Sequence, residues 1–120
     1  MKFLTRWLGV EAPGPLVGLR LRREFSLPGS FASGMALVND AVTLCLGANV
    51  EERDDAQGTL SCSFGLIEQR ERLTMHVHAH DGIAIIEIEV TFPAGRQAAA
   101  TSQALEELRR YFLAHGCTER

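Results

Sequence analysis

The clearest pattern in the chain is an alternation of apolar and polar residues on both sides of Asp81-Gly82. An Asp-Gly pair between two alternating segments is typical of a two-residue hairpin loop, because a type I′ turn needs positive φ at both central positions. Such a loop fixes the register of the two strands, and opposed residues then share one face of the sheet. The pattern predicts a β-hairpin from about Arg72 to Phe92.

The predicted register gives this hairpin two unlike faces. One face is apolar throughout, and the other is mostly polar. The apolar face consists of Leu73, Met75, Val77, Ala79, Ala84, Ile86, Ile88 and Val90. The polar face consists of Thr74, His76, His78, His80, Ile83, Ile85, Glu87 and Glu89. We expect the first face to pack against a core and the second to carry any function that the sheet has.

Alternation and helical spacing predict three further strands and two helices. Arg23 departs from the alternation of the first strand, since its position falls on the apolar face. Ser30 is a candidate N-cap for the first helix, and Gly47 is a candidate left-handed cap at its end. The expected ranges are 17–27, 48–53 and 59–66 for the strands and 30–46 and 96–115 for the helices.

The first ten residues have helical spacing, with Phe3 four residues before Trp7, and a Pro-Gly-Pro sequence then ends the pattern. We interpret residues 1–16 as an N-terminal amphipathic segment with a linker. Residues 17–120 form a single α+β domain, which suits a chain of 120 residues. The N-terminal segment could dock on a partner or a membrane surface, or pack on its own domain.

The order of elements, β-α-β-β-β-β-α, predicts an α+β fold. We expect an antiparallel five-stranded sheet with two helices packed on one face, plus a short N-terminal helix. This order resembles half of a TATA-binding-protein-like domain and, more loosely, the helix-grip folds that bind small lipophilic ligands. The resemblance covers roughly residues 17–115 and is one of topology, so it implies a fold and carries over no functional residue.

Composition narrows the classes of partner. The net charge of −3 gives no broad attraction for nucleic acid or anionic lipid, so nucleic-acid binding is not expected.

The three cysteines Cys45, Cys62 and Cys117 lack CxxC spacing, which indicates reduced thiols in a reducing compartment. No run of 18 or more apolar residues occurs, so no transmembrane segment is expected. A cytoplasmic location is the expectation, because the N-terminus lacks the features of a signal peptide.

The polar face of the hairpin suggests a metal site. Histidines two apart on a strand project from the same face, and Glu87 is expected opposite His76. Two imidazoles and a carboxylate, from His76, His78 and Glu87, suit zinc or non-haem iron. His80 or Glu89 could substitute as a ligand. The alternative is a solvated sheet face on which histidine and glutamate pair as ordinary neighbours, with no cofactor.

Two other sites follow from the predicted fold. The sheet face without helices could form a homodimer or bind a partner protein through His80, Ile83, Ile85 and Glu89. Arg23 on the apolar face could mark a cavity that holds a small anionic or amphipathic ligand. Alternatively, Arg23 lies at a bulge or an edge and extends to water.

Enzymatic function is uncertain, and the sequence favours its absence. The chain has no P-loop, no GxGxxG and no nucleophile elbow. The first interpretation is a non-enzymatic interaction or self-association module that uses the open sheet face. The alternatives are a small-ligand carrier with a cavity near Arg23 and a metal-dependent enzyme at the His/His/Glu site.

Overall fold

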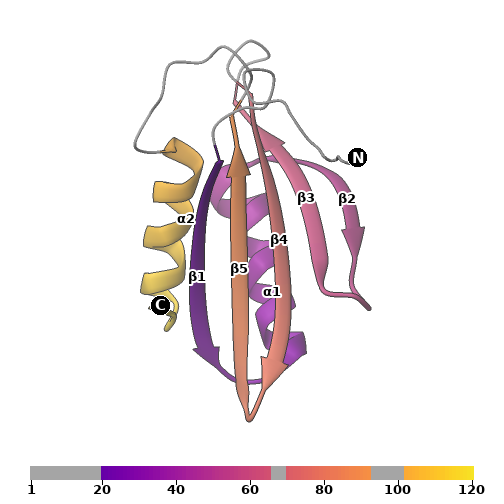
Figure 1. Ribbon diagram of the computed structural model, residues 1–120, viewed down its shortest axis with the longest axis vertical. Coiled ribbons are helices and arrows are strands. Elements are labelled where there is room, and N and C mark those ends of the chain that lie inside the picture. Colours follow the sequence, from indigo (N-terminus) through magenta and orange to yellow (C-terminus); the bar gives the residue numbers. More distant parts are fainter. Residues whose placement is uncertain (1–19, 66–69, 93–101) are drawn as a thin grey trace, which may run out of the picture.

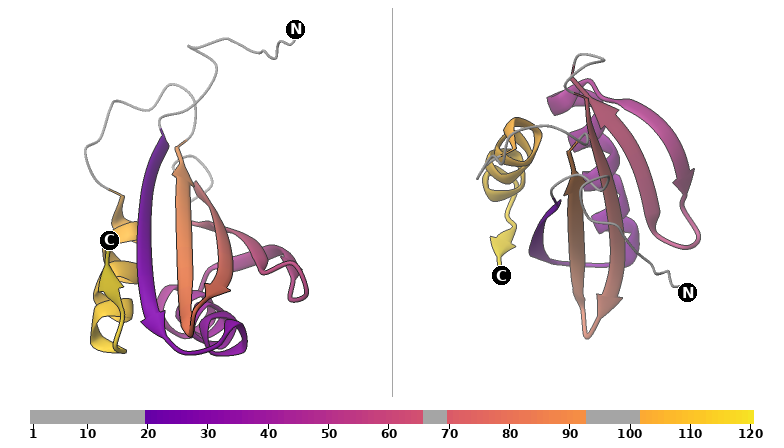
Figure 2. Two further views of the ribbon diagram at one scale, coloured as in Figure 1. Left: turned by 60° about the horizontal axis from the view of Figure 1, so that its bottom comes forward. Right: turned by 45° about the horizontal axis from the view of Figure 1, so that its top comes forward.

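A computed structural model describes residues 20–65, 70–92 and 102–120. Six strands form one antiparallel sheet in the order β2-β3-β4-β5-β1-β6, and both helices lie on the same side of it (Figures 1 and 2). The elements are β1 (Arg20–Pro28), α1 (Phe31–Asp40), the π-helical segment η2 (Ala41–Leu46), β2 (Asn49–Asp54), β3 (Thr59–Phe64), β4 (Glu71–His80), β5 (Ile83–Thr91), α2 (Gln103–Ala114) and β6 (Thr118–Glu119).

The β4–β5 hairpin has the predicted register. His80 pairs with Ile83 and His76 pairs with Glu87, and the pairing continues to the other end of the strands. Asp81 and Gly82 have φ of 53° and 76°, as the two-residue loop requires. The hairpin prediction is therefore confirmed at the level of individual residue pairs.

The apolar face of the sheet packs against the helices and forms the core. Phe25 of β1 contacts Phe112 of α2, with ring centroids 5.2 Å apart, and both side chains are fully buried. Gly34 lets α1 approach the sheet closely, because a Cβ at this position would lie 2.8 Å from Val77 Cγ1. None of the described helices is both long and apolar enough to cross a bilayer.

β1 lies beside β5 and thereby completes the open face. It pairs antiparallel from Arg20 opposite Thr91 to Pro28 opposite Ile83. Arg22 therefore stands opposite Glu89, and residues from three strands, β1, β5 and β4, share one uncovered surface.

The structure corrects the predicted fold at two places. The sheet has a sixth strand, β6, because the chain turns at Gly116 (φ 93°) after α2 and returns along β1. A strand of two residues is too short to show alternation. Helix α2 begins at Gln103, not at residue 96, since Ser102 has extended backbone angles and caps the helix. The predicted segment 1–16 and the predicted helical residues 96–101 lie outside the described residues.

Candidate functional site on the open sheet face

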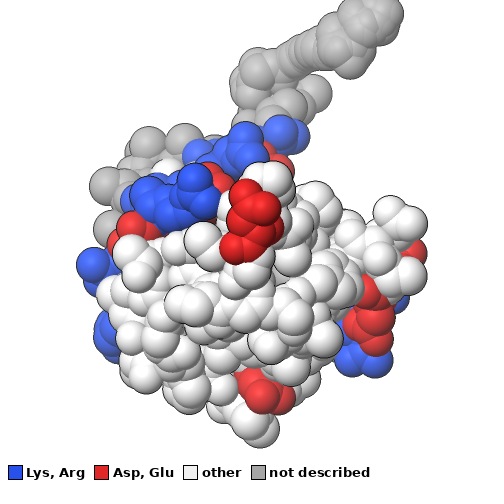
Figure 3. Space-filling view, turned by 90° about the horizontal axis from the view of Figure 1, so that it is seen from below, with Lys and Arg blue, Asp and Glu red and all other residues white. Residues whose placement is uncertain are grey.

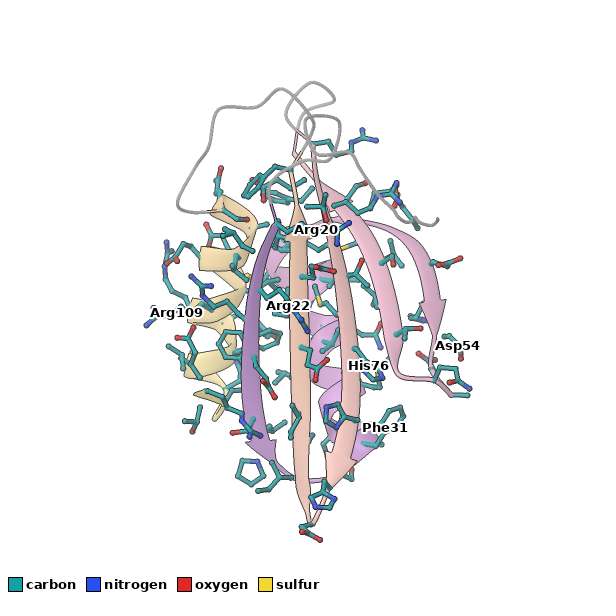
Figure 4. The ribbon with its side chains drawn as sticks, in the orientation of Figure 1. Arg20, Arg22, Phe31, Asp54, His76 and Arg109 are labelled. Atoms are coloured by element: carbon teal, nitrogen blue, oxygen red, sulfur yellow. The ribbon has the colours of Figure 1, made fainter. Side chains whose placement is uncertain are left out.

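The open face is formed by the outward side chains of β1, β5 and β4. Figure 4 shows Arg20, Arg22 and His76 on this side, with the Arg22 side chain reaching from β1 over β5. Seen from below in Figure 3, charged side chains gather along the upper part of the molecule, where the open face lies, whereas the rest of this view is mostly uncharged. Within the described residues, no helix covers this face (Figures 1 and 2).

His76, His78 and Glu87 come together at the centre of the open face. His78 Nε2 lies 3.2 Å from Glu87 Oε2, and His76 Nδ1 lies 3.8 Å from Glu87 Oε1. The two imidazole rings are 5.5 Å apart between centroids. The predicted convergence of these three side chains is confirmed, although the shorter contact of Glu87 is with its diagonal neighbour His78 and not with His76 directly opposite.

The metal site itself stays a prediction. Each oxygen of Glu87 faces a different imidazole, so the carboxylate lies between the two rings. Within the part of the chain that the structure describes, no group of three or more histidine, cysteine, aspartate or glutamate side chains has the arrangement of a metal site.

Three of the residues predicted as an interface, His80, Ile83 and Ile85, lie at and near the hairpin end of the same face. Ile83 is 42% exposed, and Ile85 beside it is half-buried. His80 Nε2 lies 3.1 Å from Asp81 Oδ2 in the exposed loop. Glu89, nearer the other end of β5, pairs with Arg20 at 3.8 Å.

Arg23 lies at the edge of the sheet. Its position opposite Ile88 belongs to the core face, as predicted, yet its side chain is 42% exposed. Arg23 Nε lies 3.6 Å from Glu119 Oε2, and the same carboxylate accepts a hydrogen bond from Arg109 Nε at 2.8 Å. This bond to Glu119 raises the pKa of Arg109. The geometry favours the edge interpretation of Arg23, and a ligand cavity between helices and sheet stays a prediction.

Two grooves adjoin on the open face, and Arg22 and Glu87 line both of them. The larger groove has a volume of about 600 Å³ and is lined by Arg22, Arg23, Glu24, Glu87, Glu119 and Arg120. The smaller has a volume of about 110 Å³ and is lined by Arg22, Thr74, His76, Glu87, Ile88 and Glu89. The role of Arg22 was not anticipated from the sequence. Its outward position could be read from the alternation of β1, but its place beside Glu87 depends on the pairing of β1 with β5.

The three thiols are poorly suited to nucleophilic chemistry. Burial raises the pKa of all three, most strongly for Cys62, whose pKa rises to about 11 with a further contribution from Glu51. A raised pKa lowers the fraction of thiolate, which is the reactive form. Cys62 lies in the core, where its side chain is fully buried, as its inward position in β3 predicted.

The raised pKa of Cys62 predicts a loss of stability at high pH. Between about pH 9 and pH 11 the unfolded chain releases this proton and the folded chain keeps it, so the free energy of unfolding falls as pH rises through that window. Urea unfolding at pH 8, 9, 10 and 11 measures how steeply the free energy of unfolding falls with pH. Cys62→Ala is expected to make this fall less steep. Cys45→Ala, at a half-buried position, is expected to change it less. Equal slopes in wild type and Cys62→Ala would contradict the prediction.

Comparison with known proteins gives the fold alone. No protein-family model and no curated protein matches the chain. The crystal structure of Ara h 8.0201 matches with a TM-score of 0.57 at 14% sequence identity, over 80% of this chain and 90% of that chain. The crystal structure of ginseng major latex-like protein 151 from Panax ginseng matches with a TM-score of 0.46 at 10% identity, over 83% of this chain and 97% of that chain. The match to Ara h 8.0201 supports the helix-grip resemblance and not the TATA-binding-protein-like one, so the fold of this chain is α+β of the helix-grip type.

Proposed function

We propose that this chain is a non-enzymatic self-association module that forms a homodimer through its open sheet face. The observation that supports the proposal most is the unequal covering of the sheet: both helices lie on one side (Figure 1), and the opposite side exposes Ile83, with the half-buried Ile85 two residues along the same strand. Because Ile83 is 42% exposed, burial of its remaining surface by a partner can gain roughly 1 kcal/mol.

The charges of the open face are arranged for pairing with a second copy. Arg20 and Arg22 lie on β1, whereas Glu87 and Glu89 lie on the neighbouring β5. An interface with two-fold symmetry brings the same patch of both copies together, so that patch must be complementary to itself. A two-fold axis between β1 and β5 would place the arginines of one copy over the glutamates of the other.

Replacement of Ile83 tests this proposal. In sedimentation velocity over about 1–100 µM, the wild type is expected to shift from monomer to dimer, and Ile83→Glu to raise the dissociation constant at least tenfold, about 1.4 kcal/mol. Leu113→Glu is the matched control, since Leu113 is 39% exposed on α2, away from the open face. A wild type that stays monomeric over this range, or equal weakening by both variants, would refute the proposal.

A further inference from the structure

The outer edge of β1 is paired along only part of its length. β6 pairs with Phe25 and Ser26, and the Arg120 N–H donates to the Glu24 carbonyl at 2.8 Å. From Arg20 to Arg23, no strand among the described residues pairs with this edge. Backbone groups of alternate strand residues point to opposite sides. The Glu24 carbonyl points outward, toward Arg120, so the backbone N–H and C=O groups of Arg22 and Arg20 point outward too. These groups are placed to pair with an added strand.

We propose that this uncovered edge binds an extended acidic segment of a partner protein, which adds to the sheet antiparallel to β1 and in line with β6. Main-chain hydrogen bonds to a free strand edge are a general mode of peptide recognition. β6 already shows that the edge accepts a strand bearing a carboxylate, because Glu119 stands opposite Phe25 and reaches the diagonal neighbour Arg23 at 3.6 Å. The groove of about 600 Å³ continues along the same edge.

The charges along the groove favour an acidic segment. Each carboxylate that lines it already has cationic or imidazole partners: Glu24 with Arg120, Glu87 with His76 and His78, and Glu119 with Arg23 and Arg109. Among the described residues, Arg22 makes no ion pair, so its guanidinium is available to an incoming carboxylate. Residues opposite Arg22 and Arg20 would be two apart on the added strand and would face the open side. Acidic residues at these two positions would form cross-strand pairs of opposite charge.

A second copy of the chain does not fit this edge. Antiparallel pairing of β1 with its own copy would bring Arg20, Arg22 and Arg23 close to the same arginines, and like charges across a strand pair are destabilising. The opposite edge of the sheet is also unsuitable for strand addition. β2 carries a bulge between Val50 and Glu52, and bulges and charges commonly protect sheet edges from pairing.

The edge site shares Arg20 and Arg22 with the dimer patch proposed above, but Ile83, whose replacement tests the dimer, lies far from it. Arg20 pairs with Thr91 at one end of β5, whereas Ile83 pairs with Pro28 at the other end. Peptide binding is therefore expected to persist in the Ile83→Glu variant. Failure of the dimer proposal would leave the edge proposal intact, and failure of peptide binding would leave the dimer proposal intact.

Titration with the blocked peptide acetyl-Glu-Val-Glu-Val-Glu-amide, followed by ¹⁵N–¹H NMR of the Ile83→Glu variant, tests the proposal. We expect the largest amide shifts at residues 20–23, and we expect Arg22→Glu and Arg22→Gln to weaken binding, the former at least tenfold. Arg72→Glu is the matched control, because Arg72 is an exposed arginine of β4, two strands away.

Two further peptides separate strand addition from simple charge attraction. Acetyl-Lys-Val-Lys-Val-Lys-amide is expected to bind at least tenfold more weakly. The acidic peptide with methylated backbone nitrogens is also expected to lose binding, because it cannot donate to the β1 edge. Equal binding of the acidic and basic peptides, undiminished binding of the methylated peptide, or shifts that lie outside residues 20–23 would overturn the proposal.

Discussion

Gly58→Ala is expected to lower the free energy of unfolding by about 2–5 kcal/mol, a large part of the stability of an ordinary domain. Gly58 has φ of 76°, in a region that costs an L-residue about 1–2 kcal/mol. A Cβ at this position would lie 2.3 Å from the Val77 carbonyl oxygen and 2.7 Å from Cε1 of Phe31. The first contact is with backbone that is held in the sheet, so it can be relieved only by moving β4 or the β2–β3 turn.

The position of Gly58 explains why no other residue fits there. Its N–H donates to the Asp54 carbonyl at 2.9 Å, and its carbonyl accepts from the Val77 N–H at 2.7 Å. These bonds hold the turn between β2 and β3 against β4, and the ring of Phe31 at the start of α1 lies close to Gly58 as well. Figure 4 labels Asp54 in this turn and Phe31 on α1.

Gly82→Ala separates the cost of the backbone conformation at Gly58 from the cost of its steric contacts. Gly82 also has φ of 76°, but a Cβ there would meet no atom within 4 Å. Its substitution is therefore expected to cost about 1–2 kcal/mol from the backbone conformation alone. Urea unfolding, fitted with the same dependence of free energy on urea concentration, measures the loss for each variant. The loss for Gly58→Ala minus the loss for Gly82→Ala gives the cost of the steric contact, about 1–3 kcal/mol. Equal losses for Gly58→Ala and Gly82→Ala would show that the contact is relieved without cost.

The predictable parts of the fold are those in which two paired strands are close together in the sequence. The Asp81-Gly82 loop alone sets the β4–β5 register, so the convergence of His76 and Glu87 followed from it. The rotamer of Glu87 did not follow, and its closer contact with His78 depends on side-chain packing that a register cannot define.

The groove could not be predicted, because it depends on distant pairings. Arg22 stands opposite Glu89 only because β1 lies beside β5, a pairing between residues more than 60 positions apart. Alternation places Arg22 on the outward face but does not say which strand flanks it. Glu119 is further removed, since β6 has two residues and no pattern. For Arg23, the sequence left a cavity and an edge position open, and the ion pair with Glu119 of this short strand favours the edge.

The start of α2 also depends on a contact between residues that are distant in the sequence, Ser102 and Glu71. The sequence contains several positions before residue 103 that suit a helix, but the helix begins after Ser102, whose hydroxyl accepts a hydrogen bond from the Leu105 N–H at 3.0 Å. The same hydroxyl donates to Glu71 Oε1 at the start of β4. Glu71 is 4% exposed, so this bond is a tertiary contact that joins the helix to the sheet.

Ser102→Ala is therefore expected to cost about 2–4 kcal/mol. Loss of the cap accounts for about 1 kcal/mol. The rest, about 1–3 kcal/mol, arises because the buried carboxylate of Glu71 loses one of its donors. Ser30→Ala is the matched control, since Ser30 caps α1 through the Ser33 N–H at 3.1 Å from an exposed position, and its loss is expected to cost only about 1 kcal/mol.

A double-mutant cycle with Glu71→Gln isolates the bond between helix and sheet. Because the two side chains touch, their combined effect is expected to differ from the sum of the single effects by about 1 kcal/mol or more. The cycle between Glu71→Gln and Ser30→Ala, which do not touch, is expected to be additive. If Ser102→Ala costs no more than Ser30→Ala, or if both cycles are additive, Ser102 serves as a cap alone and the position of α2 on the sheet depends on the apolar contact of Phe112 with Phe25.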